Sequence, residues 1–192
     1  MQVETLTGAA VGPVLDDLAR LRNAVFRDWP YLYDGSEAYE RDYLRAYEQP
    51  GAVVVTASEN GRIVGAATGA PMERHADEFG AAFAGRPERL DEIFYCAESV
   101  LLPQWRGRGL GHAFFDRREA HARAMGRKWS AFCAVQRPQD HPARPPSYRP
   151  LDDFWTGRGY VPMPGVVASF GWRDIGDETE TQKPMQFWMK PL

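Results

Sequence analysis

The sequence predicts a mixed α/β fold of the α+β type, built around a largely antiparallel sheet, and three observations support this prediction. In AVVVTASENGRIVGAATGA, two β-rich runs are joined by Asn60-Gly61, the pair that best supplies the positive φ angles of a tight hairpin turn. Further on, a strand-like run, a loop, a helical pattern and a second strand-like run follow in the order of a crossover unit, whose strands are parallel. Near the end, YVPMPGVVASFGW and PMQFWMK predict two closing strands around an acidic turn.

The first part of the chain predicts one strand and two helices. QVETL alternates between apolar and polar residues, which is typical of a strand. Apolar residues in segment 14–25 recur at helical spacing, and Pro13 suits the first turn of that helix. A second helix is expected over residues 36–47, ahead of the stop signal at Pro50.

The middle of the chain contains the crossover unit. A short helix is expected over residues 76–84, followed by a buried strand over residues 93–102. A helix then begins at residue 110, and Gly126 stands where a left-handed C-terminal cap is expected. WSAFCAV, residues 129–135, predicts the next strand.

The segment of residues 136–150 holds five prolines, too many for regular structure. A short helix over residues 151–158 is expected after it. Long connections in compact domains often act as lids or binding loops, so this segment is a candidate for either role.

Length and charge limit the functional classes. The 192 residues, 44% hydrophobic and 26% charged, predict a single domain spanning residues 1–192. A net charge of −3 argues against a dedicated nucleic-acid binder, which usually carries a basic excess. The start lacks a signal-peptide pattern and no run approaches the ~18 apolar residues of a membrane span, so we expect a soluble cytoplasmic protein.

Neither cysteine nor histidine spacing predicts a metal site. Cys96 and Cys133 stand in separate apolar strand-like runs, so buried reduced thiols are expected, with a nucleophilic role as the less favoured alternative. The four histidines show no ligand spacing, and we assign them no chemistry.

The stretch QWRGRGLGHAFF has the features of an anion-binding loop. A helix N-terminus leaves about four backbone N–H groups unpaired and carries a partial positive charge, which stabilises a phosphate. Gly107, Gly109 and Gly111 lack the Cβ atoms that would keep a pyrophosphate away from those donors. Arg106 and Arg108 can add charge-assisted hydrogen bonds, so the stretch predicts a pyrophosphate cradle.

Other interpretations of this stretch fit less well. The Walker A pattern needs a Gly-Lys-Ser or Gly-Lys-Thr triplet, which is absent from the sequence. The dinucleotide fingerprint needs a glycine where His112 stands. A glycine-rich turn with solvated arginines stays open as an alternative, although a turn needs only one or two glycines.

The arrangement Arg106-x-x-Gly109-x-Gly111, between a strand and a helix, resembles the acetyl-CoA site of the GNAT superfamily of N-acetyltransferases. FWTGRGY, residues 154–160, is similar to the family's short helix that ends before a Gly-aromatic pair, and the order of elements over residues 2–192 is compatible. The resemblance implies a GNAT-like fold: a mixed, largely antiparallel central sheet, helices on both faces and a V-shaped splay between the fourth and fifth strands.

The resemblance also implies a function and a coenzyme site. Acetyl-CoA would be the acyl donor, and its acetyl group would pass directly, in a ternary complex, to a primary amine of a small molecule or peptide. The pyrophosphate would bind residues 106–111, which add Leu110 to the residues named above. The pantetheine arm would pair with the main chain of Val100 and Leu102, whose side chains we expect in the core.

Amine acetylation needs a proton acceptor for the amine and a proton donor for the thiolate. Glu98, on the fourth strand and expected among apolar neighbours, is the candidate acceptor, with Glu92 in reserve; a hydrogen-bonded structural role for Glu98 stays open. Where many family members carry a donor Tyr, this chain has Trp155. Tyr148 is the substitute donor, or else a packing residue of the proline segment.

In the family, the region between the first two helices borders the acceptor site. In this chain the region contains Trp29, Tyr31 and Tyr33, which could line an aromatic pocket for the acceptor, with flanking aspartates attracting a cationic amine; ordinary packing is the alternative. The acidic run at residues 174–180 could attract the same cation or form a solvated turn.

Two functions from other classes are alternatives to an acetyltransferase. A non-catalytic acyl-CoA-binding or sensor protein would bind the coenzyme at the cradle and catalyse no reaction, in agreement with the absence of the usual Tyr. A nucleic-acid binder would use a set of arginines on and around the helix that begins at residue 110, but the overall acidity argues against this function. That set is Arg106, Arg108, Arg117, Arg118, Arg123 and Arg127. We expect no partner of the nucleic-acid or membrane class, and pairing of the C-terminal strands into a homodimer stays open.

Overall fold

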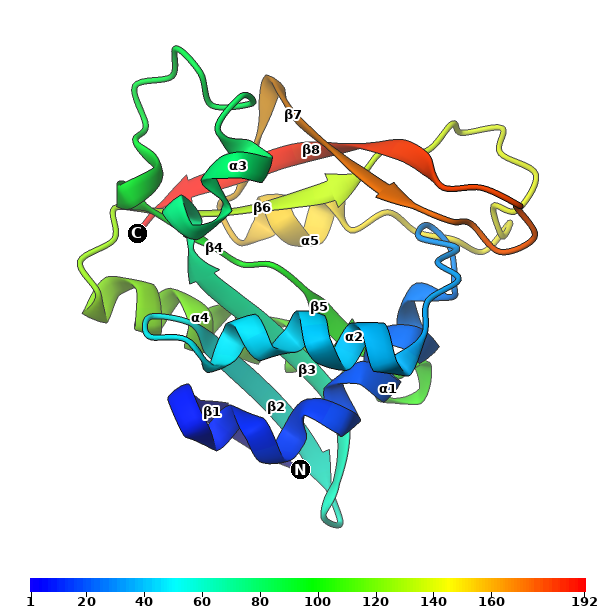
Figure 1. The fold of residues 1–192 in the computed structure, drawn as a ribbon, viewed down its shortest axis with the longest axis horizontal. Helices are drawn as coiled ribbons and strands as arrows, with labels where there is room; N and C mark the ends of the chain where they lie inside the picture. Colours follow the sequence, from blue (N-terminus) through cyan, green and yellow to red (C-terminus); the bar gives the residue numbers. More distant parts are fainter.

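The computed structural model describes residues 1–192, which form a mixed sheet flanked by helices (Figure 1). The strands pair in the order β1-β2-β3-β4-β6-β8-β7, and β5 pairs with β3 beside this path. All neighbouring pairs are antiparallel except β4 and β6, which are parallel. The strands are β1 Gln2–Leu6, β2 Val53–Glu59, β3 Arg62–Pro71, β4 Ile93–Tyr95, β5 Ser99–Leu101, β6 Trp129–Val135, β7 Val161–Trp172 and β8 Thr181–Pro191.

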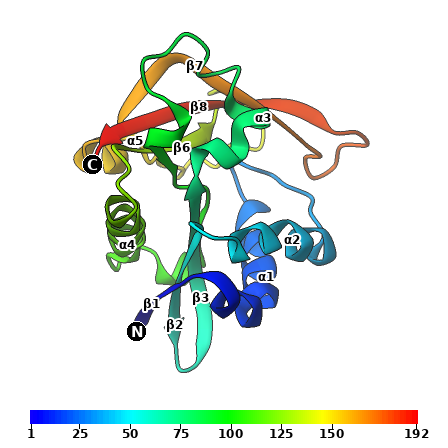
Figure 2. The same ribbon diagram turned by 60° about the vertical axis from the view of Figure 1, so that its left-hand side comes forward.

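The helices lie on both faces of the sheet. Figure 2 shows α4 and α5 on one face and α1, α2 and α3 on the other. The α-helices are α1 Leu15–Phe26, α2 Glu37–Leu44, α3 Ala76–Phe79, α4 Leu110–Ala124 and α5 Asp152–Gly157. Short 3₁₀ turns are η1 Gly8–Val14, η2 Arg45–Glu48, η3 Met72–His75, η4 Leu90–Glu92 and η5 Pro103–Trp105. The predicted mixed, mostly antiparallel fold is confirmed, and no helix among these combines the length and apolarity that crossing a membrane requires.

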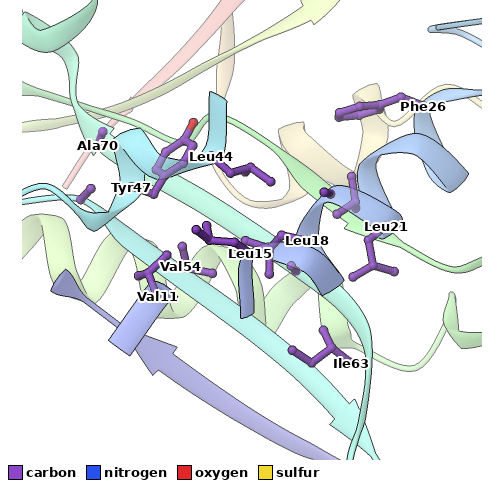
Figure 3. Packing of buried hydrophobic residues seen from close by; sticks show 14 residues of the cluster. Val11, Leu15, Leu18, Leu21, Phe26, Leu44, Tyr47, Val54, Ile63 and Ala70 are labelled. Carbon is purple, nitrogen blue, oxygen red and sulfur yellow. The ribbon is translucent and has the colours of Figure 1, made fainter. Parts of the chain in front are cut away.

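The apolar stripe of α1 packs onto the sheet. Leu15, Leu18 and Leu21 recur at helical spacing, and all three are buried against residues of α2, β2 and β3 (Figure 3). Burial of each such side chain contributes about 1.5–3 kcal/mol relative to leaving it exposed. This contact fixes α1 and α2 on the sheet face opposite α4.

Two turn predictions are confirmed by backbone geometry. Asn60 and Gly61 both have positive φ angles, 50° and 76°, as the predicted hairpin turn between β2 and β3 requires. Gly126, with φ 72°, ends α4 in the left-handed conformation. The crossover from β4 through α4 to the parallel strand β6 is confirmed as well.

Several predicted boundaries are wrong, for local reasons. Pro13 lies inside the 3₁₀ turn η1, and α1 begins only at Leu15. Helix α2 is capped by Ser36 and gives way to the turn η2 after Leu44, ahead of Pro50, and α3 ends early at Phe79. The start of α1 and the end of α2 adopt 3₁₀ geometry, as helix termini commonly do.

The predicted strand of residues 93–102 is interrupted by a β-bulge. The N–H of Ala97 donates to the carbonyl of Thr68, and the N–H of Thr68 donates to the carbonyl of Glu98, at 3.0 Å each. Two residues thus oppose one on β3, which divides the strand into β4 and β5. This bulge positions the candidate active site.

Candidate active site

The loop before α4 presents unpaired amides to solvent. Gly107 and Gly109 have φ angles of 74° and 80°, which favour glycine, and the space around both is open. The N–H of Arg106 donates to the carbonyl of Pro103, and that of Ala113 to Gly109. Between them, the N–H groups of residues 107–112 have no acceptor among the described residues. Six consecutive donors at a helix N-terminus suit an anion such as a pyrophosphate.

The two arginines of the loop are exposed and only partly engaged. Arg106 Nε donates to the carbonyl of Leu101 at 3.2 Å, and Arg108 Nη2 to the carbonyl of Gln104 at 3.2 Å. The guanidinium of Arg108 lies 4.6 Å from the centre of the Trp105 ring. Each side chain keeps further N–H donors for a phosphate.

Gly111 has a different reason to lack a side chain. A Cβ at this position would lie 3.3 Å from the Phe154 ring of α5. Its small size therefore serves the close packing of α4 against α5, while its N–H belongs to the row of unpaired donors. Sequence reasoning predicted the second property and missed the first.

Past the bulge, β5 has a free edge. The parallel pairing of β4 with β6 ends where the Cys96 N–H donates to the carbonyl of Ala131 at 2.8 Å. Figure 1 shows β5 and β6 diverging from there, and β5 pairs only with β3 in the described sheet. Ser99 is exposed although it lies in the middle of the sheet, as expected for a strand edge without a neighbour.

The main-chain groups at this edge differ from the expected ones. The N–H of Leu102 donates to the carbonyl of Val64, and its carbonyl accepts from Trp105. Val100 pairs with Ala66, two residues along the same edge, so its groups also face β3. The expectation that the main chain of Val100 and Leu102 faces a ligand is therefore wrong.

Because backbone direction alternates along a strand, the groups that face the free edge are those of Ser99 and Leu101. The side chain of Val100 is buried and that of Leu102 is partly buried in the core, as expected. A single-residue shift thus moves the candidate coenzyme contacts from the even to the odd positions of β5.

Glu98 is surrounded by hydrogen-bond donors, and the apolar environment expected for it is wrong. Its Oε1 accepts from Arg22 and, at 3.1 Å, from the hydroxyl of Tyr43; its Oε2 accepts from Thr68 and, at 3.4 Å, from Tyr47. These partners come from α1, η2, α2 and β3, so the carboxylate lies on the face of the sheet covered by α1 and α2. Tyr43 is 38% exposed and is the partner that reaches solvent.

Arg22 joins Glu98 to a second carboxylate. Its Nε donates to Glu40, which is 0% exposed and also accepts from the Tyr33 hydroxyl at 2.6 Å. Burial alone would lower the pKa of Arg22, but Glu98 and Glu40 raise it well above its ordinary value. One guanidinium between two carboxylates leaves this cluster with a net negative charge.

The proline segment meets the aromatic residues predicted for the acceptor site. The Trp29 ring lies 5.0 Å from His141 and 5.9 Å from Tyr148, centre to centre. Arg137 holds the two segments together by donating to the carbonyl of Tyr31 at 2.7 Å. The structure therefore brings Trp29 and Tyr148 together.

Tyr31 and Tyr33 point to different surroundings. Burial is the main cause that raises the pKa of Tyr31, and nearby Cys133, Glu98 and Tyr148 raise it further. Tyr31 packs against the same core clusters as Ala97 at the bulge, whereas the Tyr33 hydroxyl donates to the buried carboxylate of Glu40.

Other candidate residues have structural roles. Trp155 packs on Phe132 and Trp188, with ring centres 4.9 and 5.2 Å apart. Glu92, the reserve proton acceptor, forms a surface ion pair with Lys128 at 2.6 Å, and this hydrogen bond lowers its pKa. It precedes β4 and lies away from the bulge.

The basic face proposed for nucleic acid and the acidic turn are both altered by the structure. Arg118 is buried, and Arg127 pairs with Glu73 at 2.8 Å, so the six arginines do not form one free surface. Within the acidic run, Asp174 is buried and paired with Arg137, which contradicts a fully solvated turn. Among the described residues, no three His, Cys, Asp or Glu side chains could hold a metal ion.

Both cysteines are buried, as expected, and we predict that they react slowly. Burial raises the pKa of the Cys133 thiol to about 12, so this thiol stays almost entirely protonated, and unreactive, at pH 8. The native chain should react with an aromatic disulfide reagent at least about 100-fold more slowly than the chain unfolded in guanidinium. Rapid titration of two thiols in the native chain would contradict the burial of Cys96 and Cys133.

Comparisons with known proteins agree with this architecture. The profile of the family described as "Acetyltransferase (GNAT) family" matches residues 18–145, more than half of the chain. The chain therefore belongs to the GNAT acetyltransferase family. None of the curated proteins compared matches it significantly.

Solved structures similar to the chain share its fold at low sequence identity. One is the ribosomal-protein-alanine N-acetyltransferase of Brucella melitensis, with TM-score 0.64, 14% identity and 100% of each chain covered. Another is an aminoglycoside 6'-N-acetyltransferase complexed with coenzyme A, with TM-score 0.62, 14% identity and 100% and 97% coverage. A third is a phosphinothricin acetyltransferase of Sinorhizobium meliloti in complex with acetyl-CoA, with TM-score 0.61, 16% identity and 100% and 89% coverage.

Proposed function

We propose that the protein is an acetyl-CoA-dependent N-acetyltransferase that moves an acetyl group directly to a primary amine of a small molecule or peptide. The row of unpaired amides at residues 107–112, beside Arg106 and Arg108, is the main support. Those donors fit a pyrophosphate, and relatives of the same fold have been solved with acetyl-CoA or coenzyme A.

The residues present fit the rest of the coenzyme as well. Strand β5 ends at Leu101, and only the turn η5 separates it from the cradle. The main-chain groups of Ser99 and Leu101 on its free edge suit the amides of a pantetheine arm. The Ser99 N–H is the first donor on this edge after the bulge, which supports it as the partner of the thioester carbonyl oxygen. Leu110 completes the cradle by burying its side chain while its N–H stays unpaired.

Acetyl-CoA, when bound, supplies the acetyl group as a thioester. Transfer forms a C–N bond and breaks the C–S bond, while the amine loses one proton and the sulfur gains one. The buried, high-pKa thiol of Cys133 supports direct transfer, because a covalent acyl-cysteine needs an accessible thiolate.

Glu98 remains our proposed proton acceptor, and we propose a path by which the amine proton reaches it. Its four acceptor positions are occupied, so a proton from the amine would reach it through the one exposed donor, Tyr43. The hydroxyl of Tyr43 would accept the amine proton as its own proton passes to the carboxylate. Each group then returns to its starting state when the proton leaves to solvent.

Tyr148 remains our proposed proton donor to the sulfur. Burial raises its pKa, so the phenol stays protonated at neutral pH. Its contact with Trp29 holds the ring beside the loop that contains Tyr31. Trp155 packs in the core, which supports a donor from elsewhere in the chain.

The acceptor we propose is a cationic amine. The cluster of Glu40, Glu98 and Arg22 carries a net negative charge next to exposed Tyr43. Trp29 and Tyr31 offer aromatic surface on the neighbouring loop. The Tyr33 hydroxyl donates a hydrogen bond to Glu40 of this cluster. A positive charge near aromatic rings and carboxylates is favourable, which supports an amine rather than an acidic acceptor.

Acetyl-CoA should raise the melting temperature of the protein. A ligand at 100 times its Kd stabilises the folded state by about 2.7 kcal/mol, or about 5–10 °C for a domain of this size. Differential scanning fluorimetry with acetyl-CoA, and with acetate as the control, measures this. No shift at saturating coenzyme would overturn the proposed function. Thiol release with a panel of amines then separates an enzyme from a non-catalytic acyl-CoA-binding protein.

A further inference from the structure

Among the residues that the structure describes, Arg118 on α4 carries a buried positive charge and has no carboxylate partner. It is 1% exposed and is the largest of the fully buried side chains. The neighbouring carboxylate of Glu119 pairs with Arg158 and Lys190, and that of Glu98 lies on the opposite face of the sheet. Burying a charge costs several kcal/mol, so the hydrogen bonds that hold it have a large effect.

Neutral oxygen atoms, most of them at the bulge, surround this guanidinium. Nε donates to the carbonyl of Phe114 at 3.2 Å. Nη1 donates to the carbonyls of Thr68 and Glu98, both at 3.0 Å. Nη2 donates to the hydroxyl of Ser99 at 2.8 Å. Three of the four partners therefore belong to the place where β4 becomes β5.

One peptide unit at the bulge receives this charge directly. The carbonyl of Glu98 accepts from Arg118 and from the N–H of Thr68. In a trans peptide unit the C=O and N–H point in opposite directions, so the N–H of Ser99 points away from β3, toward the free edge. Hydrogen bonds to the carbonyl polarise the peptide, and its N–H becomes a stronger donor.

We infer that Arg118 is a positioning residue for catalysis: through the Glu98–Ser99 peptide it strengthens the Ser99 N–H as a donor to the thioester carbonyl oxygen. This rests on the proposed function, because it needs an acyl donor at the free edge of β5. Negative charge develops on that oxygen as the C–N bond forms, and it passes to the sulfur when the C–S bond breaks. A fixed buried cation stabilises the charge without reorganisation of solvent.

A purely structural role makes a different prediction. If Arg118 only ties α4 to the bulge, its loss lowers stability and leaves the electronic state of the Ser99 amide unchanged. If Arg118 polarises the peptide, the amide and a bound carbonyl both report the loss of charge. The two roles are therefore separated by spectroscopy rather than by activity alone.

The experiment compares Arg118→Gln, which removes the charge, with Arg118→Lys, which keeps it, in the full chain. Arg127→Gln is the matched control. Arg127 also donates to a main-chain carbonyl and to a side chain, but it lies beyond the C-terminal end of α4. The Ser99 amide proton is followed by NMR in the chain alone. The carbonyl stretch of bound acetyl-CoA, labelled with ¹³C at the carbonyl, is followed by difference infrared spectroscopy.

We expect the Ser99 proton of Arg118→Gln to move upfield and the bound carbonyl stretch to rise toward that of free acetyl-CoA. kcat should fall about tenfold or more, with the Kd for acetyl-CoA within about threefold of wild type. Arg118→Lys should lie between Arg118→Gln and wild type, which keeps the test valid if the Gln variant does not fold. Arg127→Gln should match wild type in both spectra.

Two results would contradict the inference, and they are distinguishable. If wild type binds acetyl-CoA and the Arg118 variants leave both signals unchanged, the polarising role is wrong and the proposed function stands. If wild type does not bind acetyl-CoA, the proposed function is wrong and the inference with it.

Discussion

Replacement of Gly109 by Glu should weaken acetyl-CoA binding about 100-fold or more, which corresponds to about 2.7 kcal/mol. Gly109 is the N-terminal cap of α4, with φ 80° and an unpaired N–H. A Glu there places a negative charge among the donors that we assign to the pyrophosphate. It also strains a left-handed residue by about 1–2 kcal/mol. Isothermal titration calorimetry with acetyl-CoA measures the change.

Gly126→Glu is the matched control. Gly126 also has a positive φ, 72°, and open space around it, but it stands at the opposite end of the same helix. It therefore has a similar backbone strain with no donors to block. We expect its coenzyme affinity to stay within about threefold of wild type. Equal losses in the two variants would mean that backbone strain, rather than the cradle, explains the effect.

The row of unpaired amides at residues 107–112 could be predicted because it depends on local sequence. Six consecutive residues contain the glycines, the arginines and the helix start, so the sequence alone indicates where unpaired amides lie. The hairpin turn at Asn60-Gly61 was predictable for the same reason, since the two residues themselves set the φ angles. The family resemblance rests on these same local signals.

The surroundings of Glu98 could not be predicted because they are assembled from distant parts of the chain. Arg22 is 76 residues away, and the two tyrosines approach from α2 and η2. The one available signal was the recurrence of Tyr43 and Tyr47 at helical spacing, which places both on one face. No sequence pattern indicates that this face meets a carboxylate.

The register of β5 was mispredicted because it depends on the bulge. Side-chain alternation along residues 98–102 is readable from the sequence, but the direction of each N–H depends on which residues pair with β3. Ala97 and Glu98 together oppose Thr68, and this fixes Ser99 and Leu101 as the free-edge positions. Arg118 was missed for a related reason, because its burial follows from packing against that same bulge.

Replacement of Glu98 by Gln should lower kcat about 100-fold or more, with the Kd for acetyl-CoA within about threefold of wild type, if the carboxylate is the proton acceptor. Gln keeps the size and an acceptor oxygen for Thr68 or Arg22 but cannot take up a proton. Steady-state assays of thiol release measure kcat, and calorimetry with acetyl-CoA measures the Kd.

Glu40→Gln separates catalysis from structure in this experiment. Glu40 is also a carboxylate partner of Arg22, and its side chain is fully buried. Removing either carboxylate leaves Arg22 with one partner, so both variants should lose stability, by about 3–5 kcal/mol at most. Only Glu98→Gln should lower kcat about 100-fold or more. If both variants lower kcat equally, the Glu98 cluster holds α1 and α2 on the sheet, and the proton acceptor lies elsewhere.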